Sequence, residues 1–155
     1  MSPGSPKVIY LARRNPSLDR AAFVRRWRQH GALAMRLPIW RHMRRYAHCD
    51  PLPQSGQVPR TCGDYDGIGL VWYRSWSAFD GIAAEPSLRE ELLRDELEVF
   101  DGHVRSFALV TQETALLDRG SGPVKLFTFL HDTAASRPCI RRALGLALRN
   151  LRPRL

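Results

Sequence analysis

"YDGIGLVWY", residues 65–73, decides the fold, because it is apolar on both of the faces that an extended chain presents. Side chains alternate along a strand, so one face carries Ile68, Leu70 and Trp72 and the other carries Gly69, Val71 and Tyr73. Strands with two apolar faces lie in the middle of a sheet. A glycine within a strand is typical of a bulge or of a close approach by another group. We therefore expect a central strand with such a feature at Gly69.

Three further segments predict the strands around it, because they are rich in β-branched, aliphatic and aromatic residues. They are "KVIYLARR" (7–14), "IWRHMRRYAHCD" (39–50) and "VRSFALVTQETAL" (104–116). Proline and glycine in residues 51–64 predict a loop before the central strand.

The first predicted helix begins at Ser17, a favourable N-cap, with Asp19 in its first turn, and it ends before Pro38. A helical repeat places four of its residues on one narrow stripe: Phe23, Trp27, His30 and Ala34. The spacing therefore predicts that His30 lies on the buried face of this helix, together with two aromatic side chains.

The second predicted helix covers residues 75–101, with interruptions near Gly81 and Pro86. Ser87 followed by Glu90 is a capping box that would restart the helix. The resulting order βαββαβ predicts an α+β, ferredoxin-like fold, with two helices on one face of a four-stranded antiparallel sheet.

Residues 39–50 indicate what the other face of that sheet carries. Period-two alternation groups the following residues on one face, towards a wet cavity or solvent: Trp40, His42, Arg44, Tyr46 and His48. With Trp40 and Tyr46 on the face that the helices leave open, a second copy of the chain is the simplest cover. We expect a homodimer in which two sheets close into a dimeric α+β barrel.

Composition excludes several classes of protein. No apolar run is long enough to span a membrane, and "MSPGSPKVIYLARR" lacks the features of a signal peptide. Cys49, Cys62 and Cys139 form no paired motif, which indicates reduced thiols in a cytoplasmic protein. The net charge of +9 raises nucleic acid as a partner, but the arginines are dispersed and no nucleic-acid-binding signature is present. We interpret the charge as a solvated basic surface.

The chain divides at a linker, "DRGSGP" (118–123). We expect one domain over residues 1–117 and a C-terminal extension over 118–155, made of a strand (124–130) and a basic amphipathic helix. The extension could be the remainder of a second module, add a strand to a sheet edge, cap the pocket or bridge the dimer. We favour packing or an oligomer contact over a membrane surface for its helix.

Four stretches carry a resemblance to the EthD family of small dimeric α+β-barrel proteins. They are F-x-x-x-W-x-x-H-G (23–31), R-R-Y (44–46), "YDGIGLVWYRSWSAF" (65–79) and "RDELEVFD" (94–101), within a match over roughly 7–116. The resemblance implies a protein that handles small molecules. Some such proteins resemble cofactor-independent decarboxylases, cyclases or monooxygenases that act on phenolic or polyketide-like compounds.

A pocket between the helices and the sheet is where such chemistry would occur in this fold. We expect catalytic roles for His30 as acid or base, Tyr46 and Asp95. The predicted ligand-binding residues, for a small aromatic or hydrophobic molecule, are Tyr10, Phe23, Trp27, His48, Trp72 and Tyr73. We expect no cofactor and no metal, since nucleotide-binding and serine-hydrolase motifs are absent and His42, His48 and Cys49 make a poor ligand set.

Structural roles compete with these assignments. His30 could be a buried, hydrogen-bonded core residue, Tyr46 could seal a dimer interface, and Asp95 could serve as an ion-pair partner for an arginine. His103, at a turn, is expected to be solvated. The alternative function is a non-catalytic dimeric domain that binds a ligand or a protein partner.

Overall fold

The computed structural model describes residues 4–51, 63–114 and 124–129. The chain forms two compact units, Met1–Arg119 and Gly120–Leu155, of which the first holds the fold described below. Its elements, in order, are β1 (Pro6–Ala12), α1 (Arg20–Arg36), η1 (Pro38–His42), β2 (Met43–Cys49), β3 (Gly67–Tyr73), α2 (Trp76–Ala84), η2 (Pro86–Arg89), α3 (Glu90–Val99), η3 (Val104–Ser106) and β4 (Ala108–Gln112), where η denotes a 3-10 helix.

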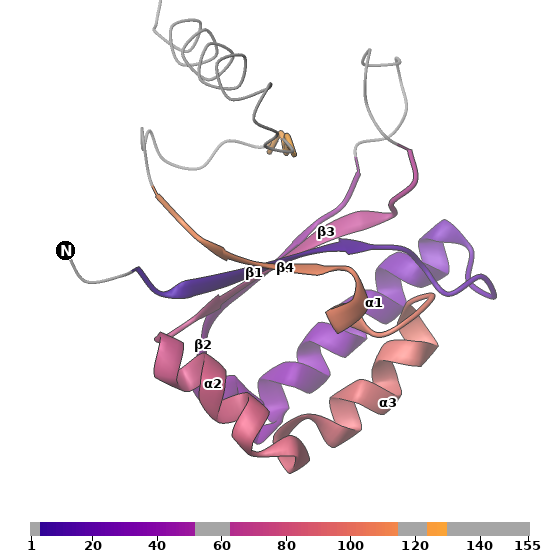
Figure 1. The fold of residues 1–155 in the computed structure, drawn as a ribbon. Coiled ribbons are helices and arrows are strands. Elements are labelled where there is room, and N and C mark those ends of the chain that lie inside the picture. The colour runs from indigo at the N-terminus through magenta and orange to yellow at the C-terminus, as the bar shows by residue number, and fades with distance from the viewer. Residues whose placement is uncertain (1–3, 52–62, 115–123, 130–155) are drawn as a thin grey trace, which may run out of the picture. The chain divides into compact units, whose positions relative to one another are not determined.

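The four strands form one antiparallel sheet in the order β2-β3-β1-β4. All helices of this unit lie on one side of the sheet (Figure 1). The predicted α+β ferredoxin-like fold is therefore confirmed, with β3 in a central position. The close approach expected at Gly69 is also found. A Cβ on Gly69 would overlap the ring of Tyr10, which comes from the neighbouring strand β1 and lies over this glycine.

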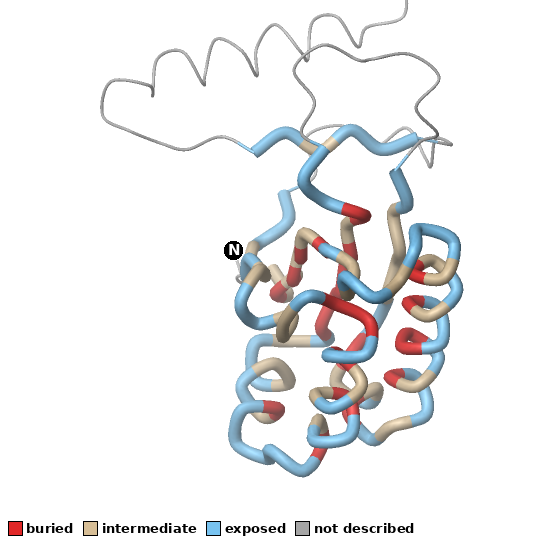
Figure 2. Tube along the Cα trace, turned by 90° about the vertical axis from the view of Figure 1, so that its right-hand side faces the viewer, coloured by how far each residue is buried: buried red, intermediate tan, exposed pale blue. Residues whose placement is uncertain are grey.

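The core lies between the sheet and the helices, and the residues of α1 that face it form the predicted stripe. Phe23, Trp27, His30, Gly31 and Ala34 are the buried residues of this helix. Figure 2 shows buried positions on one side of the helices, with the opposite side exposed; they recur along α1 and α3, whereas α2 buries Ile82 alone. The cap differs from the prediction: the carboxylate of Asp19 accepts the N–H of Ala22, so Asp19 and not Ser17 is the N-cap.

Several predicted boundaries are wrong at their ends. Residues 39–42 belong to η1, and residues 104–106 form η3, so both predicted strands start too early. The helix α2 continues through Gly81, and the capping box is absent because the chain enters α3 from η2 with Arg89 as an N-cap that makes no side-chain hydrogen bond. In the second unit, residues 124–129 are not a strand, and the predicted basic helix lies outside the described residues.

The open face of the sheet differs most from expectation. A register shift in β2 between Met43 and Arg45 inserts one extra residue, so Met43 and Tyr46 both point towards the helices. Trp40 lies in η1 and not in a strand. The prediction that Tyr46 and Trp40 occupy the uncovered face is therefore wrong. Among the described residues, no helix has both the length and the apolar character needed to cross a membrane.

Candidate functional site

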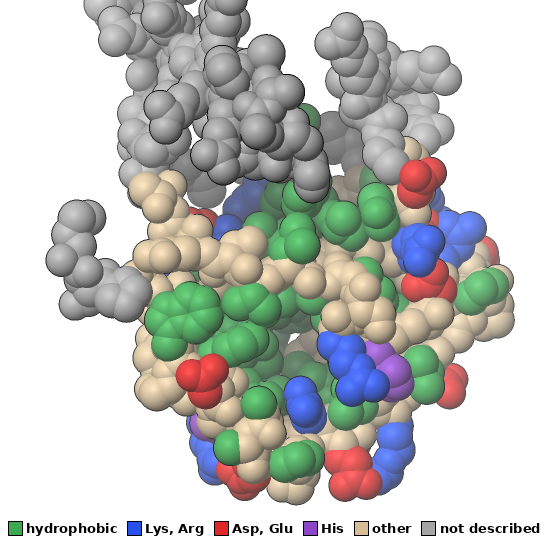
Figure 3. All heavy atoms as spheres, in the orientation of Figure 1, with side chains coloured by type: hydrophobic (Ala, Val, Ile, Leu, Met, Phe, Trp, Pro, Cys, Tyr) green, Lys and Arg blue, Asp and Glu red, His purple; other side chains and the backbone are tan. Residues whose placement is uncertain are grey.

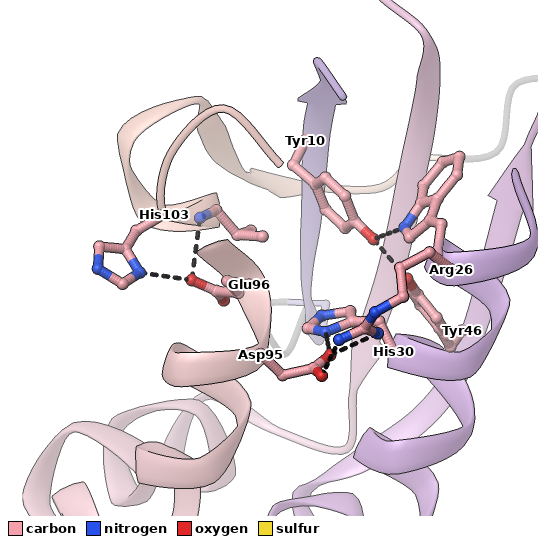
Figure 4. Close-up of polar contacts among 9 residues, drawn as sticks. Tyr10, Arg26, His30, Tyr46, Asp95, Glu96 and His103 are labelled. Carbon is pink, nitrogen blue, oxygen red and sulfur yellow. Dashed lines mark hydrogen bonds and ion pairs between the residues drawn. The ribbon is translucent and has the colours of Figure 1, made fainter. Parts of the chain in front are cut away.

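His30 and Asp95 meet where α1 packs against α3. The imidazole Nδ1 lies 2.7 Å from the Asp95 carboxylate, which also forms an ion pair with the guanidinium of Arg26 (Figure 4). Burial lowers the pKa of His30, and the hydrogen bond to Asp95 opposes this effect without reversing it. Burial raises the pKa of Asp95, but the hydrogen bonds from Arg26 and His30 outweigh it and bring the pKa below its usual value. Near neutral pH the ring is uncharged, with its Nδ1–H donated to an ionised carboxylate.

The second nitrogen of this ring, Nε2, differs from Nδ1. Within the described residues, Nε2 of His30 has no hydrogen-bond partner, although the residue is only 5% exposed. In the described part of the chain, the side-chain atoms that are both buried and without a hydrogen bond are Nε2 of His48 and Nε of Arg89, so Nε2 of His30 is not closed off from solvent. An imidazole held by a carboxylate on one nitrogen and open on the other is arranged as a general base.

Two tyrosines belong to the same part of the core as this histidine, because the rings of Tyr10 and His30 both contact Phe100, at 5.9 Å and 5.4 Å. The hydroxyls of Tyr10 and Tyr46 form a short hydrogen bond, and Nε1 of Trp27 donates to Tyr10 at 2.9 Å. Figure 4 shows these two hydroxyls turned towards each other. Burial raises the pKa of Tyr10 well above its usual value and raises the pKa of Tyr46 to about 12. Both phenols are therefore protonated at neutral pH, and only one of their two protons is needed for the hydrogen bond between them.

Close packing of aromatic rings positions these groups. A Cβ at Gly31 would lie 2.7 Å from Cε1 of Tyr46 and 2.9 Å from Cε1 of His48, so this glycine lets β2 approach α1. The rings of Trp27 and His48 are 4.4 Å apart. Burial is the main reason that the pKa of His48 falls to about 4, and its neutral ring fills space beside Trp27.

Sequence reasoning missed a buried acid. Glu96 is 6% exposed and accepts hydrogen bonds at 3.1 Å from the ring of His103 and from the N–H of Val104. The expectation that His103 is solvated is thus wrong, because this contact holds it half-buried. A signal was present: Glu96 lies between Leu92 and Val99 at helical spacing, on the buried stripe of α3.

The structure brings together most, but not all, of the predicted site residues. His30 and Asp95 form one contact, and Tyr10, Tyr46, Trp27 and His48 form a second set of contacts. Phe100 joins the two sets, because its ring lies 5.4 Å from that of His30 and 5.9 Å from that of Tyr10. Phe23 supports the second set from behind, stacked on Trp27 at 5.3 Å, and Tyr73 lies nearer α2, against Phe79. Trp72 does not belong to the site, because it points to the opposite face of the sheet, where Lys7 and Arg45 cover its ring.

No group of residues in the described part of the chain could hold a metal ion. A separate open pocket of about 470 Å³ lies near the start of α1, away from His30. Ion pairs occupy it, with Arg14 and Arg20 on Asp66 and Arg13 on Asp101. Its lining residues are Arg13, Arg14, Pro16, Arg20, Gly63, Asp64, Asp66 and Asp101.

Comparison with protein families matches the EthD domain over residues 15–103. A comparison with curated proteins gave no match. Among solved structures, the chain is similar to a dimeric ferredoxin-like protein of unknown function from Thermobifida fusca, with 17% identity, 73% of this chain and 94% of that chain covered, and a TM-score of 0.48. It is similar to a hypothetical Arabidopsis thaliana protein, with 16% identity, coverage of 74% and 92%, and a TM-score of 0.48.

SnoaB, a cofactor-independent oxygenase from Streptomyces nogalater, is a more distant match. The identity is 13%, the alignment covers 76% of this chain and 100% of that chain, and the TM-score is 0.38.

Proposed function

The chain belongs to the EthD family, and we propose that it transfers a proton to or from a small phenolic or polyketide-like compound bound between the sheet and the helices, with His30 as the acid or base. One observation carries this proposal. His30 donates Nδ1–H to the ionised Asp95, while its Nε2 has no hydrogen-bond partner among the described residues and is accessible to solvent. A purely structural histidine at this degree of burial would ordinarily have both nitrogens satisfied.

The neighbouring phenols supply the second requirement of this chemistry. Nε2 of His30 takes a proton from a phenol O–H or an activated C–H of the substrate, and the negative charge moves to the substrate oxygen. The hydroxyl proton that Tyr10 and Tyr46 do not share is available for that oxygen. The same residues can then return the proton at carbon, which serves a cyclisation or a decarboxylation. Asp95 positions the imidazole and stabilises its protonated form.

The proposal extends to assembly. The face of the sheet opposite the helices carries Ile9, Leu11 and Ile68, which are only partly buried. A second copy of the chain would cover this face, giving a homodimer with one pocket in each protomer. Light scattering at several concentrations tests this part separately.

A deuterium-exchange assay tests the proton transfer without knowledge of the natural substrate. The probe is 1,3-dihydroxynaphthalene, whose ring C–H exchanges through its keto tautomer, followed by proton NMR in deuterated buffer. We expect the wild-type protein to accelerate exchange and His30→Asn to lose about 100-fold or more of that acceleration. His42→Asn is the matched control, because His42 lies in η1 outside both sets of contacts. Equal acceleration by the His30 and His42 variants would refute the assignment.

The tight aromatic packing favours a second candidate, a non-catalytic binding domain. Glycines at positions 31, 67 and 69 each lie directly under an aromatic ring, so side chains fill much of the interior. In that case the probe binds, as followed by tryptophan fluorescence, but its exchange rate equals that in buffer.

A further inference from the structure

Arg89 has no partner for its charge. It lies at the end of η2, and its Nε is buried without a hydrogen bond. Within the described part of the chain the side chain makes neither a hydrogen bond nor an ion pair. Nearby arginines differ, since Arg26 pairs with Asp95 and Arg94 pairs with Glu90. A buried donor on a charged group is costly to leave unpaired, which makes Arg89 a candidate for binding a ligand.

Arg89 is half-buried where η2 ends and α3 begins. Its Nε is enclosed by the protein, and the preceding residue, Leu88, belongs to the hydrophobic core. Tyr73 belongs to the same part of the core, because η2 packs against α2, whose Phe79 contacts the ring of Tyr73 at 5.0 Å. Burial raises the pKa of this phenol to about 12, and the charge of Arg89 opposes the rise.

Tyr73 offers a second unused donor at the same place. The residue is 8% exposed, and its ring lies 5.0 Å from that of Phe79. Its hydroxyl makes no hydrogen bond to any described residue, and it is not closed off from solvent. A phenol O–H and a guanidinium, both without a partner among the described residues, thus lie in the same part of the core, and the phenol O–H is reached by solvent.

The surface of the molecule is hollowed on the side that presents β4, α2 and α3. Figure 3 shows hydrophobic side chains around this hollow and basic side chains beside it. Two aromatic contacts belong to this part of the fold: Phe79 of α2 lies against Tyr73, and Phe100, which follows α3, lies against Phe107, which precedes β4. Apolar walls with basic neighbours suit an aromatic molecule that carries a negative charge.

We propose that Arg89 and Tyr73 form an anion subsite, which binds a carboxylate or phenolate on the aromatic substrate. This inference rests on the proposed function and adds the charge of the substrate to it. Glu96, the buried acid of α3, is the carboxylate that would compete for Arg89. Its hydrogen bonds from His103 and Val104 hold this carboxylate, leaving Arg89 as the cation for the ligand.

The test compares two probes of nearly equal shape, 2-naphthoate and the neutral 2-naphthamide, by titration calorimetry on the full chain. We expect the wild-type protein to bind naphthoate about tenfold or more tightly than naphthamide, as a charge-assisted hydrogen bond predicts. Arg89→Met should remove this preference, because naphthoate loses its charged partner and then binds no more tightly than naphthamide. Arg94→Met, in the next turn of α3 on its exposed side, should keep the preference. Tyr73→Phe should reduce it in part.

Each other outcome has a distinct meaning. Equal binding of the two probes by the wild-type protein refutes the anion subsite while leaving the pocket and the role of His30 intact. A preference that survives Arg89→Met places the anion elsewhere and also refutes it. Binding of neither probe refutes the pocket and, with it, both proposals. The wild-type comparison needs no variant, so the inference stays testable if Arg89→Met fails to fold.

Discussion

Gly31→Ala sets two opposing effects against each other in the middle of α1. An alanine is favoured over glycine within a helix by about 1 kcal/mol. The added Cβ would, however, lie 2.7 Å from Tyr46 and 2.9 Å from His48, whereas carbon atoms in contact are normally ~3.5–4.0 Å apart. His48 is held against Trp27, and Tyr46 is bonded to Tyr10, so neither ring can simply turn away.

Overpacking of this kind costs about 1–3 kcal/mol, so we expect the steric cost to equal or exceed the gain in helix propensity. Gly81→Ala is the matched control, since it makes the same change inside α2, where the nearest atom is 3.5 Å from the new Cβ. It should raise the free energy of unfolding by up to about 1 kcal/mol.

Urea denaturation of both variants measures the difference directly. We expect Gly81→Ala to be the more stable by about 1–3 kcal/mol, with the midpoint temperatures differing in the same direction by roughly 3 °C or more. Two equally stabilised variants would show that β2 does not lie against α1 as described.

Three further predictions follow from the buried network. The unfolding free energy should fall as the pH falls from about 6.5 towards about 4, because the unfolded chain then protonates histidines that stay neutral in the fold. In denaturation experiments at several pH values, His48→Gln should reduce this dependence on pH. An unchanged dependence would show that another group causes it. Asp95→Asn should lower the pKa of His30 still further, because Asp95 raises it in the wild-type protein, and an upward shift in an NMR titration would contradict the hydrogen bond. Tyr10→Phe should lower the unfolding free energy by about 1–3 kcal/mol, against less than about 0.5 kcal/mol for the exposed Tyr65→Phe, in the same denaturation assay; similar losses would refute the buried hydroxyl pair.

The fold could be predicted because its signals are local and redundant. The apolar character of both faces of 65–73 indicates a central strand whatever surrounds it, and the stripe on α1 needs only the helical period. The boundaries at Ile39 and Val104 could not be predicted in the same way. Short 3-10 turns there use the same aliphatic residues that a strand would, and tertiary contacts decide between them.

The site could be predicted only in part. The stripe predicted that His30 faces inward, and the structure adds that Asp95 holds its Nδ1 while also pairing with Arg26. Asp95 therefore fills both of the roles considered for it, as a partner of His30 and as an ion-pair partner of an arginine. Glu96 was missed because charged residues are rarely buried, and a single charged residue on an apolar stripe is easily assigned to the surface. Its position between Leu92 and Val99 at helical spacing is the signal that finds it. Arg89 was missed because it is only half-buried, and no sequence pattern marks its enclosed Nε.

The placement of Tyr46 shows how one inserted residue changes a functional assignment. Strict alternation along β2 would put Met43 and Tyr46 on opposite faces, since they are three residues apart. The extra residue between Met43 and Arg45 lets both enter the core, Met43 opposite Tyr73 and Tyr46 opposite Val71. Without it, packing Met43 against the helices would carry the Tyr46 hydroxyl to the far side of the sheet, away from Tyr10 and His30. The bulge is therefore what allows the packed side chain of Met43 and the hydroxyl that bonds Tyr10 to come from the same strand.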